Sequence, residues 1–188
     1  MDTKSEIYKK ALEIFTKRGY DNTPMSHIAK ALGVTKAALY HHFPSKEGLL
    51  YFIIDRMTEE RFMPILDEAE KIPDPENRLT YFVKHYAKLL TEDATAKIII
   101  HEARRLAPQD FKKIKKTYRR AFDLLKTSIS EIQASHHSKK LNPSFVAFAA
   151  IGMCSWTFYW FDYTRKDSRE ELADTFLEVL FKGIAPEE

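Results

Sequence analysis

Glycine is scarce in this 188-residue chain, which contains only five, and cysteine occurs once. So few glycines argue against the tight turns of a β-sandwich. The single thiol, Cys154, cannot form an internal disulfide, and we expect it to be a small core residue. No apolar run approaches the roughly 20 residues that span a bilayer, and the first ten residues lack a secretory apolar stretch. These absences predict a cytoplasmic protein that makes no membrane contact.

The motifs of common enzyme classes are also missing. The sequence has no Walker loop, no dinucleotide glycine pattern and no serine elbow. His101 and Glu102 begin like the helix of a zinc protease, but Arg105 stands where the second histidine ligand belongs. We therefore expect no catalytic residues, no metal site and no cofactor.

Hydrophobic residues make up 44% of the chain and charged residues 30%, which is enough apolar surface for a folded core. The apolar residues recur at helical spacing, and no segment alternates with the period of two that marks a strand. Thr23 and Thr35 are expected to cap helices, and Pro64 to kink one. The pattern predicts an all-α chain of about nine helices, near residues 3–19, 23–33, 35–43, 45–70, 76–91, 94–106, 109–134, 143–165 and 169–183.

Charge is segregated along the chain although the net charge is only +3. Residues 1–46 hold eight Lys and Arg against four Asp and Glu, and residues 104–126 hold nine against two. Most of the remaining chain is acidic. Two basic regions on an acidic body indicate an anionic partner that approaches particular faces.

Two short helices that flank Gly33 carry most of the functional information. Gly33 can adopt the left-handed conformation that a side chain resists, and Val34 is expected to plug the turn into a small core. The second helix leaves small and hydrogen-bonding side chains exposed, as a helix that enters the major groove requires. Two interpretations stay open at this point, DNA binding and an ordinary helical hairpin with a solvated basic face. The exposed residues are Thr35, Lys36, Ala37, Ala38, Tyr40, His41 and His42.

The runs GYDNTPMSHIA (19–29) and LYHHFPSKEGLL (39–50) resemble the TetR family of bacterial and archaeal transcriptional regulators. The resemblance implies a homodimer on a double-stranded DNA operator, with a DNA-binding domain at 1–46 and a ligand-binding and dimerisation domain at 47–188. It implies groove and phosphate contacts by Thr35, Lys36, Ala37 and Ala38. The two alanines offer only methyl groups, so the helix either touches thymine methyls or leaves base readout to Lys36 and His41. The phosphate contacts that the resemblance implies fall to Ser26, Tyr40, His42 and Lys46.

The helix predicted near 143–165 carries many aromatic residues. A single helix does not bury so many inside its own subunit. The resemblance implies that this helix and the last one form the dimer interface, whereas the alternative is a monomer core. Met153, Trp156 and Trp160 share one stripe that faces either the ligand pocket or the partner subunit. The other residues expected at the pocket are Phe82, Tyr86, Ile99, Glu102, Tyr118 and Phe122.

The basic run at 112–120 is either a solvated helix face or a docking surface for phosphates. Together with residues 101–106 and 151–161 it resembles the lipid-responsive branch of the family, whose members bind fatty acyl-CoA or related thioesters. The resemblance implies an apolar effector whose chain enters the aromatic core, while Arg105, Lys116 and Arg119 hold the phosphates. Two alternatives remain: a repressor of an efflux pump that senses drugs or planar aromatics, and a helical lipid carrier without DNA function.

Overall fold

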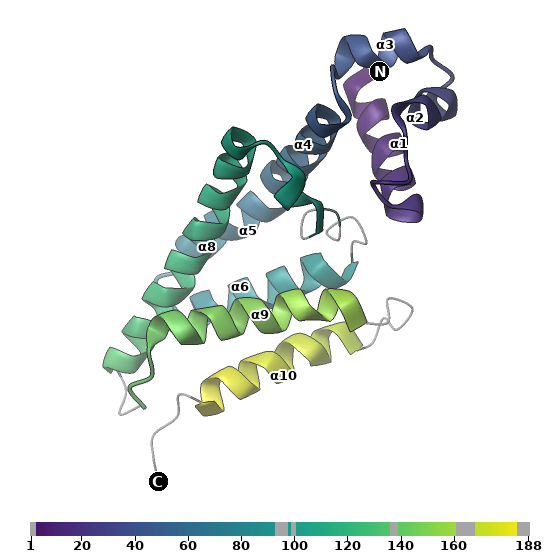
Figure 1. The fold of residues 1–188 in the computed structure, drawn as a ribbon. Helices are drawn as coiled ribbons and strands as arrows, with labels where there is room; N and C mark the ends of the chain where they lie inside the picture. The colour runs from purple at the N-terminus through teal and green to yellow at the C-terminus, as the bar shows by residue number, and fades with distance from the viewer. Residues whose placement is uncertain (1–2, 93–97, 99–100, 136–138, 161–167, 184–188) are drawn as a thin grey trace. The chain divides into compact units, whose positions relative to one another are not determined.

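The structure is a computed structural model that describes residues 3–92, 98, 101–135, 139–160 and 168–183. These residues form helices and no strand, which confirms the all-α prediction (Figure 1). None of the described helices is long and apolar enough to cross a membrane. The α-helices are α1 (Thr3–Arg18), α2 (Met25–Leu32), α3 (Lys36–His42), α4 (Lys46–Met57), α5 (Met63–Glu70), α6 (Pro75–Glu92), α8 (Pro108–Ser135), α9 (Pro143–Trp160) and α10 (Ser168–Gly183).

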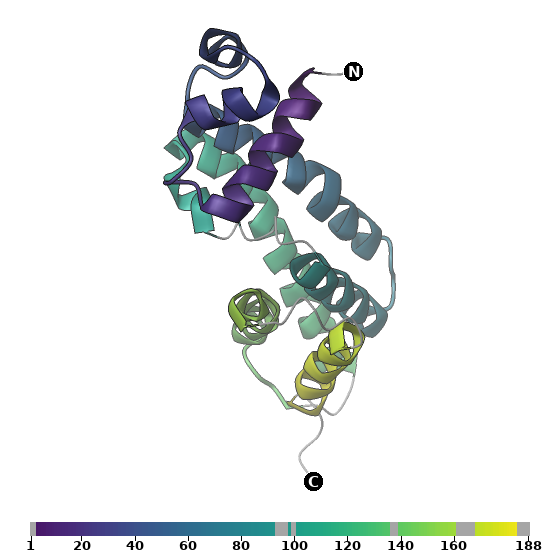
Figure 2. The same ribbon diagram turned by 90° about the vertical axis from the view of Figure 1, so that its right-hand side faces the viewer.

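The chain divides into two compact units. Unit 1 comprises Met1–Thr58 and Ala94–Ile114, and unit 2 comprises Glu59–Asp93 and Lys115–Glu188. In unit 1, α2 packs against α1 and α3, and α4 contacts α1 and the short 3-10 helix η2 (Ala103–Arg105). In unit 2, α6 packs against α5, α9 and α10, which lie beside it in both views (Figures 1 and 2).

The core of unit 1 follows from the spacing of apolar residues in α1 and α4. Ile7, Ala11 and Phe15 recur every four residues, so they fall on one face of α1, and all three are buried. Gly19 ends α1 in the left-handed conformation, with φ of +78°, as a glycine after a helix commonly does. The apolar face of α4 completes the core with Leu49, Leu50, Ile53, Ile54 and Met57.

Two predictions about the turns of unit 1 are wrong. Thr23 does not cap α2, because α2 begins at Met25 with Pro24 as its N-cap. The Thr23 hydroxyl instead donates to the Gly19 carbonyl at 2.8 Å, and this bond satisfies a carbonyl beyond the end of α1. Val34 does not plug the turn into the core, since its side chain is 41% exposed and only its backbone N–H closes the end of α2.

The predicted helix at 45–70 is interrupted by a π-helical turn, η1 (Thr58–Phe62), between α4 and α5. Pro64 lies in the first turn of α5. Proline lacks an N–H, and inside an α-helix its ring clashes with the carbonyl four residues earlier. A π-helical turn directly before Pro64 therefore stands where the sequence predicts a kink. The boundary between unit 1 and unit 2, after Thr58, falls within this turn.

Small residues let helices of unit 2 approach closely. On α9 the buried positions are Ala147, Ala150 and Cys154, and α9 packs against α6 and α10. The prediction that Cys154 is a core residue is confirmed, and its burial raises the pKa of the thiol to about 12.

Candidate DNA interface and effector-binding residues

The turn between α2 and α3 is built around Gly33. Its φ of +69° and ψ of +23° are left-handed, and its N–H donates to the Lys30 carbonyl at 3.1 Å. The Val34 N–H donates to the Ala29 carbonyl at 3.0 Å. These two bonds satisfy carbonyls at the end of α2 that would otherwise lack partners, and they fix the direction in which the chain enters α3.

Thr35 caps α3, as the sequence predicts. Its Oγ1 accepts a hydrogen bond from the Ala38 N–H at 3.1 Å, and its own hydroxyl proton remains available to a second acceptor. Leu39 is fully buried and anchors the inner face of α3. The outer face therefore consists of exposed residues, which are Lys36, Ala37, Ala38, Tyr40 and His41, with His42 half-buried beside them.

The segment from residue 22 to residue 46 contains no aspartate or glutamate. It carries three lysines and three histidines, and Ser26 and His27 are exposed on α2. The Lys36 Nζ lies 5.6 Å from the centroid of the Tyr40 ring, one helical turn further on. With no carboxylate in the segment to oppose a phosphate, α2 and α3 present a face suited to a polyanion.

Lys46 is engaged within unit 1. Its Nζ donates to the Tyr20 carbonyl at 2.6 Å and lies 4.0 Å from the centroid of the Tyr20 ring. Ser45 caps α4, because its Oγ accepts from the Gly48 N–H at 2.9 Å. Lys46 therefore ties the turn between α1 and α2 to the start of α4, and two of its three N–H donors remain for another partner.

Arg105 links η2 to the same turn. Its Nη2 donates to the Asp21 carboxylate at 2.7 Å, and its Nε donates to Oε2 of Glu102. Its guanidinium lies 5.5 Å from the Tyr20 ring, and burial and the nearby Glu47 carboxylate raise the pKa of Tyr20 to about 12. Glu102 and Arg105, two of the residues expected to bind the effector, thus belong to unit 1 and pair with each other.

An aromatic cluster from three elements lies in unit 2. The Phe62 ring centroid is 5.3 Å from that of Tyr86, 5.4 Å from that of Tyr118 and 6.4 Å from that of Phe82. The Tyr86 hydroxyl lies 3.3 Å from the Ser155 Oγ. Burial raises the pKa of Tyr86 to about 12 and that of Tyr118 as well, so both phenols stay neutral at physiological pH.

The structure thus brings three of the predicted pocket residues together, Phe82, Tyr86 and Tyr118. Sequence reasoning missed Phe62, which contacts all three; its only signal was its place in the apolar pattern of the predicted helix. The Phe122 ring lies elsewhere on α8, 4.7 Å from Phe148, and Met153 is half-buried. Ile99 and the side chain of Trp160 lie outside the described residues.

One face of α9 is apolar and exposed. Phe145, Phe148 and Trp156 are 70%, 62% and 63% exposed, and the small residues Ala149 and Gly152 between them are exposed too. The spacing places all five on a single stripe. The Trp156 side chain therefore lies on this exposed stripe.

In the basic run at 112–120 on α8, some residues form ion pairs with carboxylates and three lysines are exposed. Arg120 binds two carboxylates of α5. Its Nε and Nη2 donate to Glu70 at 2.7 and 2.6 Å, and its Nη2 also donates to Asp67 at 2.6 Å. Lys113 pairs with Asp55 at 2.7 Å, and Arg119 faces Asp123 at 3.2 Å. Lys112, Lys115 and Lys116 are exposed.

Within the part of the chain that the structure describes, no group of three or more His, Cys, Asp or Glu side chains could hold a metal ion.

Two family models match the chain over most of its length. Residues 7–51 match the model described as bacterial regulatory proteins, tetR family, and residues 73–184 match the tetracyclin repressor-like C-terminal domain.

Two curated proteins are similar to the N-terminal part. Over 69 residues the chain is 36% identical to YuxN of Bacillus subtilis (strain 168), an uncharacterised HTH-type transcriptional regulator. The matched segment covers 37% of this chain and 24% of YuxN. Over 46 residues the chain is 41% identical to IcaR of Staphylococcus aureus (strain Newman), a negative transcriptional regulator of the biofilm operon icaADBC. This segment covers 24% of this chain and 25% of IcaR. The chain spans about a quarter of the length of the curated relatives that it matches.

A solved structure is similar across nearly the whole chain. The crystal structure of AibR in complex with isovaleryl coenzyme A and operator DNA has a TM-score of 0.86 and 29% sequence identity, covering 95% of this chain and 97% of that one.

Proposed function

Because this chain belongs to the TetR family of transcriptional regulators, we propose that it is a repressor that binds a palindromic operator as a homodimer and leaves it when an apolar effector binds. Members of the family are DNA-binding transcription factors, so the chain is neither an enzyme nor the helical carrier considered above. The observation that carries the proposal is the acid-free, exposed face of α2 and α3, held in place by the left-handed turn at Gly33.

We assign DNA recognition to residues 1–46. The Thr35 hydroxyl proton, the Lys36 ammonium and the Tyr40 hydroxyl are exposed donors for phosphates. Ala37 and Ala38 offer only methyl groups, which suit thymine methyls. His41 joins Lys36 in reading base edges, and the remaining phosphate contacts fall to Ser26, His42 and Lys46, whose ammonium keeps two free donors.

We assign effector binding and dimerisation to residues 47–188. The exposed stripe of α9 supports a homodimer, because soluble monomers rarely expose several large aromatic side chains side by side. Ala149 and Gly152 within the stripe allow a second helix to approach closely, and Val179 adds an exposed apolar residue on α10. A two-fold dimer would present two α3 helices to successive major grooves, about one DNA turn apart.

For the effector we propose a fatty acyl-CoA or a related thioester, which would link the protein to lipid metabolism. The aromatic cluster of Phe62, Phe82, Tyr86 and Tyr118 offers an apolar site. AibR, which binds isovaleryl coenzyme A, supports this class of ligand. Burying about ten methylenes at ~0.8 kcal/mol each contributes roughly 8 kcal/mol, which corresponds to micromolar affinity.

The phosphates of the coenzyme A group need cations near that site. Lys115, Lys116 and Arg119 are exposed members of unit 2 on α8 and are suited to this role. Arg105 already pairs with Asp21 and Glu102 in unit 1, so we do not assign it to the effector phosphates. Release of DNA requires the effector to prefer the arrangement that does not bind DNA, typically by about 1–3 kcal/mol of coupling.

The DNA-binding role is tested by selecting an operator from random duplexes and titrating it with paired variants. Lys36→Ala should weaken binding and reduce the salt dependence by about two counterions, one for each subunit of the dimer. Lys71→Ala removes an equally exposed charge from unit 2 and should change neither quantity. Tyr40→Ala should weaken binding to all sequences alike; a changed sequence preference would show that Tyr40 reads bases.

The effector class is tested by releasing operator DNA with acyl-CoA of increasing chain length. Each added methylene should strengthen the effect about fourfold if it is fully buried. Equal potency of short and long chains would refute the acyl site. Release by planar cationic dyes instead would favour the alternative of a drug-sensing repressor of an efflux pump, for which the stacked aromatic cluster would serve equally well.

A further inference from the structure

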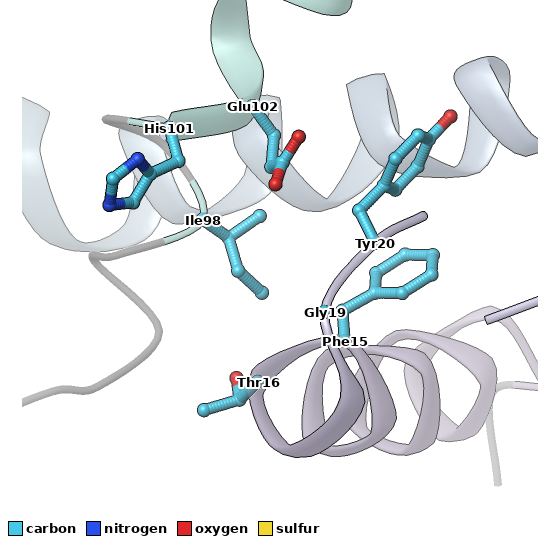
Figure 3. Close-up of a pocket in the computed structure, with 7 residues that line it drawn as sticks. All are labelled: Phe15, Thr16, Gly19, Tyr20, Ile98, His101 and Glu102. Carbon is cyan, nitrogen blue, oxygen red and sulfur yellow. The ribbon is translucent and has the colours of Figure 1, made fainter. Parts of the chain in front are cut away.

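A cavity of about 140 Å³ lies in unit 1, between the end of α1 and the residues Ile98, His101 and Glu102 (Figure 3). It belongs to neither the DNA-binding face nor the aromatic cluster of unit 2. An apolar cavity of similar volume in another protein holds a benzene molecule, so this space suits a ligand with one ring or a short alkyl chain. Its lining consists of Phe15, Thr16, Gly19, Tyr20, Ile98, His101 and Glu102.

The walls of the cavity are mostly apolar. The Phe15 and Tyr20 rings are tilted against each other with their centroids 5.2 Å apart, and both residues are buried. Ile98 is buried as well, and Figure 3 shows it across the space from α1. Because Gly19 carries no side chain, nothing projects into the space from that position. These walls favour a hydrocarbon.

Glu102 brings a carboxylate to this apolar space, beside Tyr20 (Figure 3). Its side chain is only 18% exposed. The hydrogen bonds that the described residues make to Glu102 use Oε2 alone, which accepts from the Arg105 Nε, so Oε1 is left with its full acceptor capacity. Oε1 can therefore accept a hydrogen bond from a ligand that carries a donor.

The charges around the cavity call for one more cation. Arg105 is a single positive charge that faces two carboxylates, Asp21 and Glu102. Lys46, whose ammonium lies over the Tyr20 ring, and Glu47, next to the Tyr20 hydroxyl, carry opposite charges that offset each other. The Arg105 group therefore carries a net charge of −1. Thr16 donates its proton to the Leu12 carbonyl and offers only lone pairs, and the lining also includes the His101 ring.

We propose that this cavity binds a small hydrophobic amine in its ammonium form. The ammonium donates to Glu102 Oε1, and its ring or alkyl group packs against Phe15, Tyr20 and Ile98. A carboxylate of the same shape is repelled by Glu102, and an alcohol of the same shape leaves the negative charge uncompensated. Charge complementarity and the apolar walls together select the class of ligand.

The experiment compares three probes of one shape, benzylamine, benzyl alcohol and benzoate, by calorimetric titration of the intact protein. Benzylamine has eight heavy atoms and should bind with a dissociation constant of about 1 mM or lower. The alcohol and the acid should bind at least about tenfold more weakly, since the alcohol brings no positive charge to Glu102 and the acid brings a negative one. Equal binding of the alcohol, or no binding of the amine, would overturn the proposal.

Variants then locate the site. Glu102→Gln keeps the shape of the side chain and removes its charge, so it should weaken benzylamine binding at least about tenfold. The matched control is Glu131→Gln, which removes a carboxylate paired with Arg78 in unit 2 and should leave benzylamine binding unchanged. Ile98→Trp should fill the cavity and abolish binding with thermal unfolding kept close to that of the unaltered protein. Undiminished binding in Glu102→Gln or Ile98→Trp would place the amine elsewhere and refute the site.

Discussion

Replacing Gly33 tests whether the turn between α2 and α3 depends on its left-handed backbone. A Cβ built at Gly33 would meet no atom within 4 Å, so a steric clash with neighbours contributes nothing to the effect of Gly33→Ala. What remains is the backbone conformation, at φ of +69°, which costs a residue with a side chain about 1–2 kcal/mol.

The unfolded chain supplies an opposing term. Alanine restricts the unfolded ensemble more than glycine does, which offsets about 0.4–1 kcal/mol of that cost. The net loss for Gly33→Ala is therefore about 1 kcal/mol in the free energy of unfolding. With a urea dependence of about 2 kcal/mol per M, the unfolding midpoint should fall by about 0.5 M.

The assay is urea unfolding followed by circular dichroism, at one fixed protein concentration because any association between copies would contribute to apparent stability. Gly33→Asn should lose less than Gly33→Ala, since asparagine tolerates the left-handed region. Gly33→Val should lose the most. An unaltered midpoint for Gly33→Val would refute the reasoning, because it would mean that the turn accepts another backbone conformation.

Three further outcomes are expected. Phe62→Ala should lower the free energy of unfolding by about 3–5 kcal/mol, because it empties the centre of the aromatic cluster; a loss below ~1 kcal/mol in urea unfolding would contradict that central place. Arg120→Lys keeps the charge but loses the bidentate hydrogen bond to Glu70, so the free energy of unfolding should fall by about 1 kcal/mol. An unchanged urea midpoint would show that the charge alone suffices. Cys154, with a pKa of about 12, should resist iodoacetamide at pH 8 until the protein unfolds; rapid alkylation of the folded protein, followed by mass spectrometry, would disprove its burial.

The sequence predicts the region around α3 well because its signals are local. Gly33 and Thr35 act through backbone groups no more than four residues away, and the structure has both in their expected roles. Thr23 offered an equally local alternative. A threonine hydroxyl can accept at the start of the next helix or donate to the end of the previous one, and here the second bond forms. Residue type alone does not separate these two uses.

The ion pairs of unit 1 were out of reach of sequence reasoning. Arg105 finds Asp21 at a separation of 84 residues, and nothing in either local pattern indicates the other. The predicted grouping of Glu102 and Arg105 with the pocket aromatics came from helical spacing, which shows which residues share a face but not which helix covers that face. Phe62 was missed for the same reason. The sequence did not show that Trp156 is exposed, because apolarity alone does not distinguish a buried helix face from an exposed one.

The wide turn at Thr58–Phe62 changes the phase of the helix in which it lies. In α4 the buried positions end with Ile53, Ile54 and Met57, and regular α-helical spacing would continue them at 61, 64 and 68, all of which are exposed. The buried positions instead fall one or two residues later, at Phe62, Leu66 and Ala69.

The turn thus acts as a one-residue insertion. A homologue that lacks one residue between Met57 and Phe62 would keep both buried stripes along a regular α-helix. Pro64 opposes that shorter form, because its ring would then clash with the carbonyl four residues before it, at a cost of about 3 kcal/mol. The length of the turn and the proline should therefore change together, and relatives that lose the extra residue are expected to have lost the proline as well.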